Sequence, residues 1–152
     1  MMSVKELLAR KGGEVHCVRP EATVYEALEL MADRNIGAVM VVDETGEIQG
    51  LFSERDYARK NIIKGRSTHG TRVKEMMTRK VLYVQPEATI LDCMNLMTEK
   101  RVRHLPVLEN GKLVGVVSIG DVVKDLISHQ ETVISQQAFQ ISQLERYISG
   151  SP

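Results

Sequence analysis

The alternation of hydrophobic and polar positions predicts a chain of short helices and strands. Apolar side chains recur at helical spacing across residues 24–34, which predicts an amphipathic helix. The continuous apolar run at 38–42 is typical of a buried strand, and a polar turn separates it from a second apolar run. The elements expected in this half are a helix at 3–10, a strand at 15–18, a helix at 24–34, strands at 38–42 and 48–52, and a helix from 53 to about 63.

The same order of elements returns in the second half of the chain. Ile90, Cys93 and Met97 define one face of a helix. Apolar runs at 105–108 and 113–117 predict two strands joined at Asn110-Gly111, a pair that favours a tight hairpin because both residues tolerate positive φ. Each half therefore consists of a strand, a helix, two strands and a helix.

This order reflects an internal repeat. The segment 20–24 (PEATV) returns 66 residues later as PEATI. The segment 50–53 (GLFS), with Asp56 after it, returns 65 residues later as GVVS with Asp121. Each copy is one supersecondary unit close to the size at which a core becomes marginal, so we expect the copies to fold together. The expected divisions are a lead-in helix with the first repeat (1–64), a linker (65–72), the second repeat (73–128) and a C-terminal helix (129–152).

The tail of the chain has a different pattern. Residues 122–148 contain no proline or glycine, and Ile134, Ile141 and Ile148 are spaced by seven. Ala138 and Leu144 fill in a narrow apolar stripe, which usually packs on another helix. We expect one long helix that helps to hold a homodimer, because twofold pairing is the commonest oligomer.

Composition excludes several functional classes. The 152 residues carry a formal net charge of zero, with 43% hydrophobic and 26% charged residues, which fits a soluble globular protein without a field for nucleic acid or membranes. No signal peptide or membrane span is visible, and two cysteines make no disulfide framework, so a cytoplasmic protein is expected. The four histidines lack metal-ligand spacing, so no metal site is expected.

The glycine-x-x-serine-x-x-aspartate pattern is the main candidate for chemistry. It ends a buried strand and opens a helix, whose free N–H groups can bind phosphate while a carboxylate binds ribose hydroxyls. The same serine and aspartate can instead cap the helix itself, as Thr89 and Asp92 are expected to do elsewhere. The pattern alone leaves both interpretations open.

The repeats resemble a pair of cystathionine-beta-synthase (CBS) domains, the tandem called a Bateman module. The resemblance covers residues 15–127 and rests on FSERDY at 52–57, HLPV at 104–107 and VSIGDVV at 117–123. More narrowly, the chain is similar to small stand-alone bacterial and plant proteins of this kind. The resemblance implies an α/β (α+β) fold in which two βαββα repeats pack with pseudo-twofold symmetry and leave two clefts.

The resemblance also implies an adenosine ligand, such as AMP, ADP, ATP, NAD or S-adenosylmethionine. In the second repeat, Ser118 would contact phosphate and Asp121 the ribose. His104 and Pro106 would lie near the adenine, and Val81 would line the base pocket. The corresponding positions of the first repeat are Ser53, Asp56, Ala38, Met40 and Val15.

The two predicted sites differ in sequence. Ala38 and Met40 stand where the second repeat has His104 and Pro106, so we expect unequal occupancy. Arg55 is a further candidate, either as a bidentate phosphate ligand or as a solvated arginine in the first turn of its helix.

Three functions fit these observations. The first is a non-catalytic regulatory protein that binds an adenine nucleotide and modulates a partner enzyme. The second is an enzyme, but no paired acid and base or activated nucleophile is visible, and the barrel of a dehydrogenase that carries this module needs about 250 residues. The third is an interaction module with empty clefts. We expect no catalytic residues and no catalytic cofactor.

Overall fold

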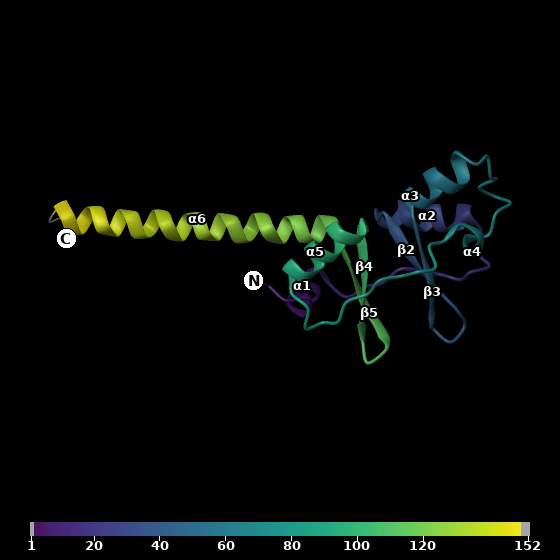
Figure 1. The fold of residues 1–152 in the computed structure, drawn as a ribbon, viewed down its shortest axis with the longest axis horizontal. Helices are drawn as coiled ribbons and strands as arrows, with labels where there is room; N and C mark the ends of the chain where they lie inside the picture. The colour runs from purple at the N-terminus through teal and green to yellow at the C-terminus, as the bar shows by residue number, and fades with distance from the viewer. Residues whose placement is uncertain (1, 150–152) are drawn as a thin grey trace.

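The computed structural model describes residues 2–149, and it has the mixed helix-and-strand fold that the sequence predicts. A body of two similar units carries one long helix that extends away from it (Figure 1). The elements are α1 (Val4–Lys11), β1 (Cys17–Val18), α2 (Val24–Arg34), β2 (Ala38–Val42), β3 (Ile48–Ser53), α3 (Glu54–Asp56), the π-helical turn η1 (Tyr57–Ile62), α4 (Val73–Met76), α5 (Ile90–Lys100), β4 (His104–Glu109), β5 (Lys112–Ser118) and α6 (Ile119–Ser149).

Each repeat is built around a small sheet. In the first, β1 runs parallel to β2, and β2 pairs antiparallel with β3. In the second, β4 and β5 form the hairpin, and the strand expected before α5 is reduced to a single parallel bridge between Val84 and Val107. Ala38 pairs with Ser53 in the first sheet, as His104 pairs with Ser118 in the second. The register therefore places equivalent residues at equivalent ends of the two sheets.

The two repeats exchange their lead-in helices. Val4 and Leu7 of α1 are buried in the core of the second repeat, together with Ile90 and other residues of that repeat. Val73 and Met76 of α4 are buried in the core of the first repeat. Each core thus contains a helix that the chain supplies from beside the other repeat. This exchange links the folding of the two units, because neither core is complete without it.

Backbone hydrogen bonds fix the exchange with the same geometry on both sides. The N–H of Val4 donates to Ala88 O at 2.8 Å, and the N–H of Val73 donates to Ala22 O at 2.8 Å. Lys5 and Lys74 donate in the same way to the carbonyls of the prolines that begin the two PEAT segments, both at 3.0 Å. The repeated PEAT sequence is therefore the docking edge for the exchanged helix.

The glycine of each repeated pattern makes room for the exchanged segment. A Cβ at Gly115 would lie 2.6 Å from Leu8 Cδ2, and a Cβ at Gly50 would lie 2.7 Å from Thr78 O and 2.8 Å from Met77 Sδ. Real Cβ atoms do not approach other atoms so closely, so both positions require glycine for the packing to stay as it is. The glycine signal in the sequence thus has a packing cause.

Candidate functional site

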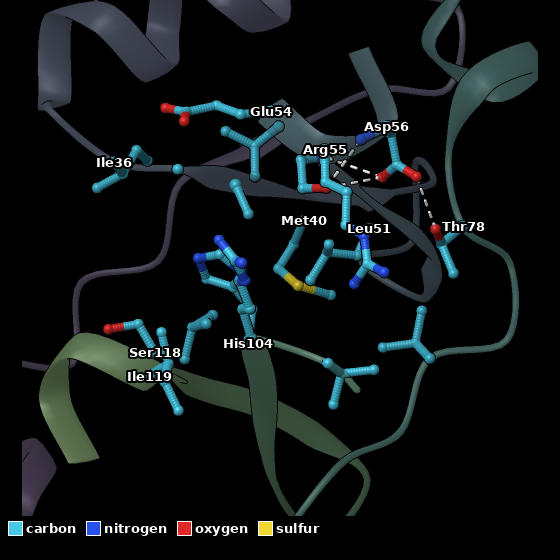
Figure 2. Close-up of a pocket in the computed structure, with 18 of the residues that line it drawn as sticks. Ile36, Met40, Leu51, Glu54, Arg55, Asp56, Thr78, His104, Ser118 and Ile119 are labelled. Atoms are coloured by element: carbon cyan, nitrogen blue, oxygen red, sulfur yellow. Dashed lines mark hydrogen bonds between the residues drawn. The ribbon is translucent and has the colours of Figure 1, made fainter. Parts of the chain in front are cut away.

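A cavity of about 790 Å³ lies between the two repeats. Ten of the eleven residues that the sequence singled out line it: Val15, Ala38, Met40, Ser53, Arg55, Asp56, Val81, His104, Ser118 and Asp121. Both Ser-x-x-Asp corners open on this same cavity, whereas the resemblance implied two clefts. Figure 2 shows Met40 and His104 entering the space from opposite strands, with Arg55 and Ser118 at its edges.

Pro106 is the one candidate residue that does not line the cavity. It is buried in β4, where its carbonyl accepts a hydrogen bond from the N–H of Val84 at 3.0 Å. Side chains alternate between the two faces of a strand, but a residue two positions from His104 also lies deeper along the strand. Pro106 is thus buried between the core residues Leu105 and Val107 of its strand without reaching the cavity, whereas His104 lines it.

The first corner, Ser53 with Asp56, is closed by its own contacts. Asp56 Oδ2 accepts hydrogen bonds from Ser53 N at 3.0 Å and from Ser53 Oγ at 3.1 Å. Asp56 Oδ1 accepts one from Thr78 Oγ1 at 3.0 Å and forms an ion pair with Lys60 Nζ at 3.2 Å (Figure 2). The Asp56 side chain is only 9% exposed. Both of its oxygens are therefore already engaged.

The second corner, Ser118 with Asp121, is more open. Asp121 Oδ2 accepts from Ser118 N at 2.8 Å and from Lys11 Nζ at 2.6 Å, and the Asp121 side chain is 22% exposed. Burial alone would raise the pKa of Asp121, but the hydrogen bonds from Lys11 and Ser118 outweigh it and hold the pKa below its usual value. The carboxylate is therefore charged at neutral pH and has one oxygen outside these contacts.

Lys11 is a cavity residue that the sequence interpretation missed. It stands at the end of α1, and besides its bond to Asp121 it donates to Val116 O at 2.8 Å. It reaches this position because α1 packs on the second repeat, 110 residues away in sequence from Asp121. The sequence could have indicated it, because residues 4–8 (VKELL) resemble residues 73–77 (VKEMM). At the same offset, Lys80 corresponds to Lys11.

His104 provides a half-buried, uncharged polar group on the cavity wall. Its ring lies close to the position of Gly37, whose Cβ, if present, would be 3.7 Å from Nε2. Burial lowers the pKa of His104, Asp121 partly offsets this, and Lys11 and Arg103 lower it further. The imidazole is therefore neutral at pH 7, so that one nitrogen can donate and the other can accept a hydrogen bond.

Cationic side chains predominate around the cavity. Seven of its lining residues are lysine or arginine and four are aspartate or glutamate. An adjoining hollow of about 470 Å³ is lined by Arg55, Arg59, Arg101 and Arg103, which come from both repeats. Arg55 is exposed and also donates to Arg101 O at 2.9 Å, which holds its guanidinium at the edge of the cavity. Together these groups make one side of the cavity suitable for an anion.

Other candidate chemistry is weak in the described part of the chain. Residues 2–149 contain no cluster of three or more histidine, cysteine or acidic side chains able to hold a metal ion. Burial raises the pKa of the Cys93 thiol to about 11, and Asp92 adds to the shift, so this thiol is unreactive at neutral pH. None of the described helices is long and apolar enough to cross a bilayer.

Comparisons with known proteins agree with this architecture. The family model described as "CBS domain" matches residues 4–61 and 73–128. The chain is 40% identical over 132 residues to the CBS domain-containing protein CBSX3, mitochondrial, of Arabidopsis thaliana, a match that covers 84% of this chain and 61% of that relative. The chain thus spans less than two thirds of that relative.

Solved structures show the same fold. A protein with CBS domains from Burkholderia ambifaria is 48% identical, with a TM-score of 0.81 and coverage of 85% of this chain and 96% of that one. The CBS domain pair of protein MJ0100, solved with 5-methylthioadenosine and S-adenosyl-L-methionine, is 21% identical with a TM-score of 0.74, covering 82% and 99% of the two chains. The repeat, the paired sheets and these matches together place the chain in the CBS domain family, as a tandem CBS pair.

Proposed function

We propose that this CBS pair is a non-catalytic regulatory protein that binds an adenosine nucleotide and modulates a partner enzyme. The observation that carries the proposal is the cavity between the repeats, which combines a charged carboxylate at Asp121, a neutral half-buried imidazole at His104 and a cationic edge. These groups suit a ribose, a base and a phosphate respectively. AMP, ADP, ATP and NAD share all three parts.

In this proposal the second corner makes the principal contacts. Ser118 and the first turn of α6 face the phosphate, and Asp121 receives a ribose hydroxyl on the oxygen not used by Lys11. His104 and Val81 border the base. The first corner contributes Val15, Ala38, Met40, Ser53 and Asp56 to the facing wall, with Arg55 near the phosphates.

S-adenosylmethionine is a second ligand candidate. The CBS pair of MJ0100 was solved with this compound, and it contains the same adenosine group. Its sulfonium is cationic, however, and the excess of lysine and arginine around the cavity favours the phosphate-bearing ligands.

The proposed role involves no catalysis. Ligand binding would favour one arrangement of the two repeats over another, and the exchanged helices α1 and α4 would carry that change between them. The proposed compartment is the cytoplasm, since Cys17 and Cys93 are both free thiols.

An interaction module without a ligand is a second candidate function. It is favoured by the observation that both Ser-x-x-Asp pairs cap their own helices, with Asp56 N and Asp121 N each 3.2 Å from the serine Oγ. Exposed apolar residues at equivalent positions of the repeats fit such a module: Tyr25 and Leu91 are both 43% exposed, and Ile62 and Ile127 are 61% and 55% exposed.

The test is ligand release and titration. Mass spectrometry of small molecules freed from the purified protein should detect an adenosine compound, and calorimetry with AMP, ATP, NAD and S-adenosylmethionine should rank the ligands. Asp121→Ala should weaken binding of the preferred nucleotide by about 1–3 kcal/mol, or roughly 5- to 150-fold, because hydrogen bonds to a charged group are lost.

The matched control is Asp92→Ala. Asp92 forms the same type of cap with Thr89, with Asp92 N 3.1 Å from Thr89 Oγ1, but it does not line the cavity. Asp92→Ala should therefore lower the melting temperature by a similar amount and leave nucleotide affinity unchanged. Equal affinity in wild type and Asp121→Ala would contradict the ribose assignment, and no binding of any of the four compounds would favour the interaction module.

A further inference from the structure

The long helix α6 leaves the body of the molecule with an apolar stripe that the chain itself does not cover. Figure 1 shows α6 extending well past the two repeats. Val122, near its start, is fully buried in the second core. Farther along, Ile134, Ile141, Leu144 and Ile148 are between 56% and 82% exposed. A lone helix with such a stripe is marginal in water, so its stability requires a partner surface.

The stripe follows a heptad repeat over almost four heptads. Ile127, Ile134, Ile141 and Ile148 are seven residues apart and occupy the a positions. The d positions are Val123, Gln130, Gln137 and Leu144. Branched isoleucine at every a position with leucine or valine at the outer d positions favours two-stranded coiled coils. The pattern therefore indicates pairing with one other helix of the same type.

The two glutamines decide the direction of pairing. In a parallel, in-register pair, each d residue faces its own copy, so Gln130 meets Gln130 and Gln137 meets Gln137, and their amides can bond to each other. In an antiparallel pair with the same overlap, a faces d, so Ile134 would face Gln137 and Ile141 would face Gln130. Four of the eight layers would then set a glutamine amide against an isoleucine, which costs free energy.

The flanking charges also permit the parallel pair. In this register a g residue lies near the e residue five positions on in the other helix, which brings together Leu126 with Glu131, Val133 with Ala138, and Gln140 with Glu145. None of these pairs sets like charges against each other.

The length of the stripe is sufficient for a stable interface. From Val123 to Ile148 the helix rises about 39 Å, at about 1.5 Å per residue, and contains eight a or d layers. A stable interface buries about 800 Å² per partner, so each layer must bury about 100 Å² per chain. An exposed isoleucine, leucine or glutamine, together with the neighbouring e and g side chains, can supply that area.

We propose that α6 pairs with α6 of a second copy as a parallel, in-register two-stranded coiled coil over residues 123–148. The occupant of the exposed stripe is therefore this same chain. The parallel direction places both CBS pairs at the same end of the rod. Because α6 begins at Ile119, directly after Ser118, the rod is also continuous with the cavity edge. The pairing does not depend on whether the cavity binds a nucleotide.

The test is position-specific disulfide formation in the full chain. In a Cys17→Ser background, which removes the exposed native thiol, Leu144→Cys should form a covalent dimer in a glutathione redox buffer on a non-reducing gel. The control Gln143→Cys, one residue outside the stripe, should form much less. An antiparallel pair would instead cross-link the double variant Ile127→Cys/Leu144→Cys while neither single variant reacts.

A second measurement keeps the result independent of thiol chemistry. In light scattering the wild type should be a dimer, and Ile134→Asp/Ile141→Asp should lower the dimer fraction at least tenfold at low protein concentration. The control Ser135→Asp/Ser142→Asp, at the positions next to these isoleucines, should leave the dimer fraction unchanged. Equal cross-linking at positions 143 and 144, cross-linking only in the double cysteine variant, or an unchanged dimer fraction in the aspartate variant would each overturn the proposal. Nucleotide titration of the same variants reports separately on the cavity.

Discussion

The two Ser-x-x-Asp corners have the same sequence pattern and the same capping geometry, yet their aspartates differ in availability. Asp56 is 9% exposed in its side chain and engages Ser53, Thr78 and Lys60 with its two oxygens. Asp121 is 22% exposed and receives Ser118 and Lys11 on one oxygen. The difference shows that a repeated motif can be fully engaged by the fold in one copy and leave a carboxylate oxygen outside these contacts in the other.

The neighbouring residues strengthen this contrast. At the strand position opposite the serine, the first repeat has the small Ala38 and the second has His104. Lys60 lies four residues from Asp56 on the same helical segment, whereas Lys11 reaches Asp121 from the exchanged helix α1. A ligand could displace Lys11 by a small movement of its side chain, but releasing Asp56 would break contacts from three residues.

The largest expected effect is on stability, and it should distinguish the two aspartates. Asp56→Ala should lower the free energy of unfolding by about 2–3 kcal/mol, because Thr78 Oγ1 and Ser53 N lose their acceptor and Lys60 keeps only its backbone carbonyl contacts. Asp121→Ala should cost only about 1 kcal/mol, the usual cost of losing a helix cap. Urea denaturation of both variants measures the difference, and equal losses would mean that the two corners are equivalent.

The two motif glycines provide a second comparison. Gly50→Ala should destabilise by about 2 kcal/mol, since its Cβ would meet the backbone carbonyl of Thr78, which cannot move alone. Gly115→Ala should cost about 1 kcal/mol, since the clash is with the flexible end of the Leu8 side chain. Thermal unfolding of the two variants checks the order. If Gly115→Ala proved the more damaging, the packing of α1 on β5 would have to be tighter than the packing on β3 of the segment that follows α4.

Binding stoichiometry should also reveal the contrast. We expect one nucleotide per chain to bind more tightly than any second one, because His104 and the open Asp121 both belong to one corner. Calorimetric titration data should therefore fit either a single site or two sites of unequal affinity per chain. A good fit to two equivalent sites per chain would contradict the inequality. Replacing His104 by alanine, which gives it the residue found at position 38, should weaken the tight site.

The smallest expected effect is a pH dependence from His104, at whose equivalent position the first repeat has Ala38. His104 has a pKa below its usual value in the folded state, so the unfolded chain binds its proton more strongly. Its contribution to stability is therefore complete above about pH 6.5 and is lost as the pH falls below that value. The slope should be at most about 1.4 kcal/mol per pH unit. In His104→Gln, the free energy of unfolding should fall less between pH 7 and pH 5 than in the wild type, as measured by urea denaturation at each pH.

Much of the local structure could be predicted from the sequence. The range of α2, the strand at 38–42 and the hairpin at Asn110-Gly111 follow from periodicity and turn chemistry, which depend on neighbouring residues. The expected helix from Ser53 to Ile63 was less accurate, because after three α-helical residues the chain continues as a π-helical turn to Ile62. The first strand of the second repeat, expected from the symmetry, is reduced to one bridge.

The description of the candidate site depended on both the sequence and the tertiary structure. The sequence by itself determined the repeat and the caps, because these follow from patterns a few residues long. The resemblance to CBS domains supplied most of the candidate site residues, and ten of the eleven line one cavity. Only the tertiary structure decided that α1 and α4 change places, that Lys11 reaches Asp121, that arginines of both repeats meet, and that Pro106 does not line the cavity. These outcomes join residues up to 110 positions apart, and such contacts are selected by the packing of whole elements, which no local pattern in the chain specifies.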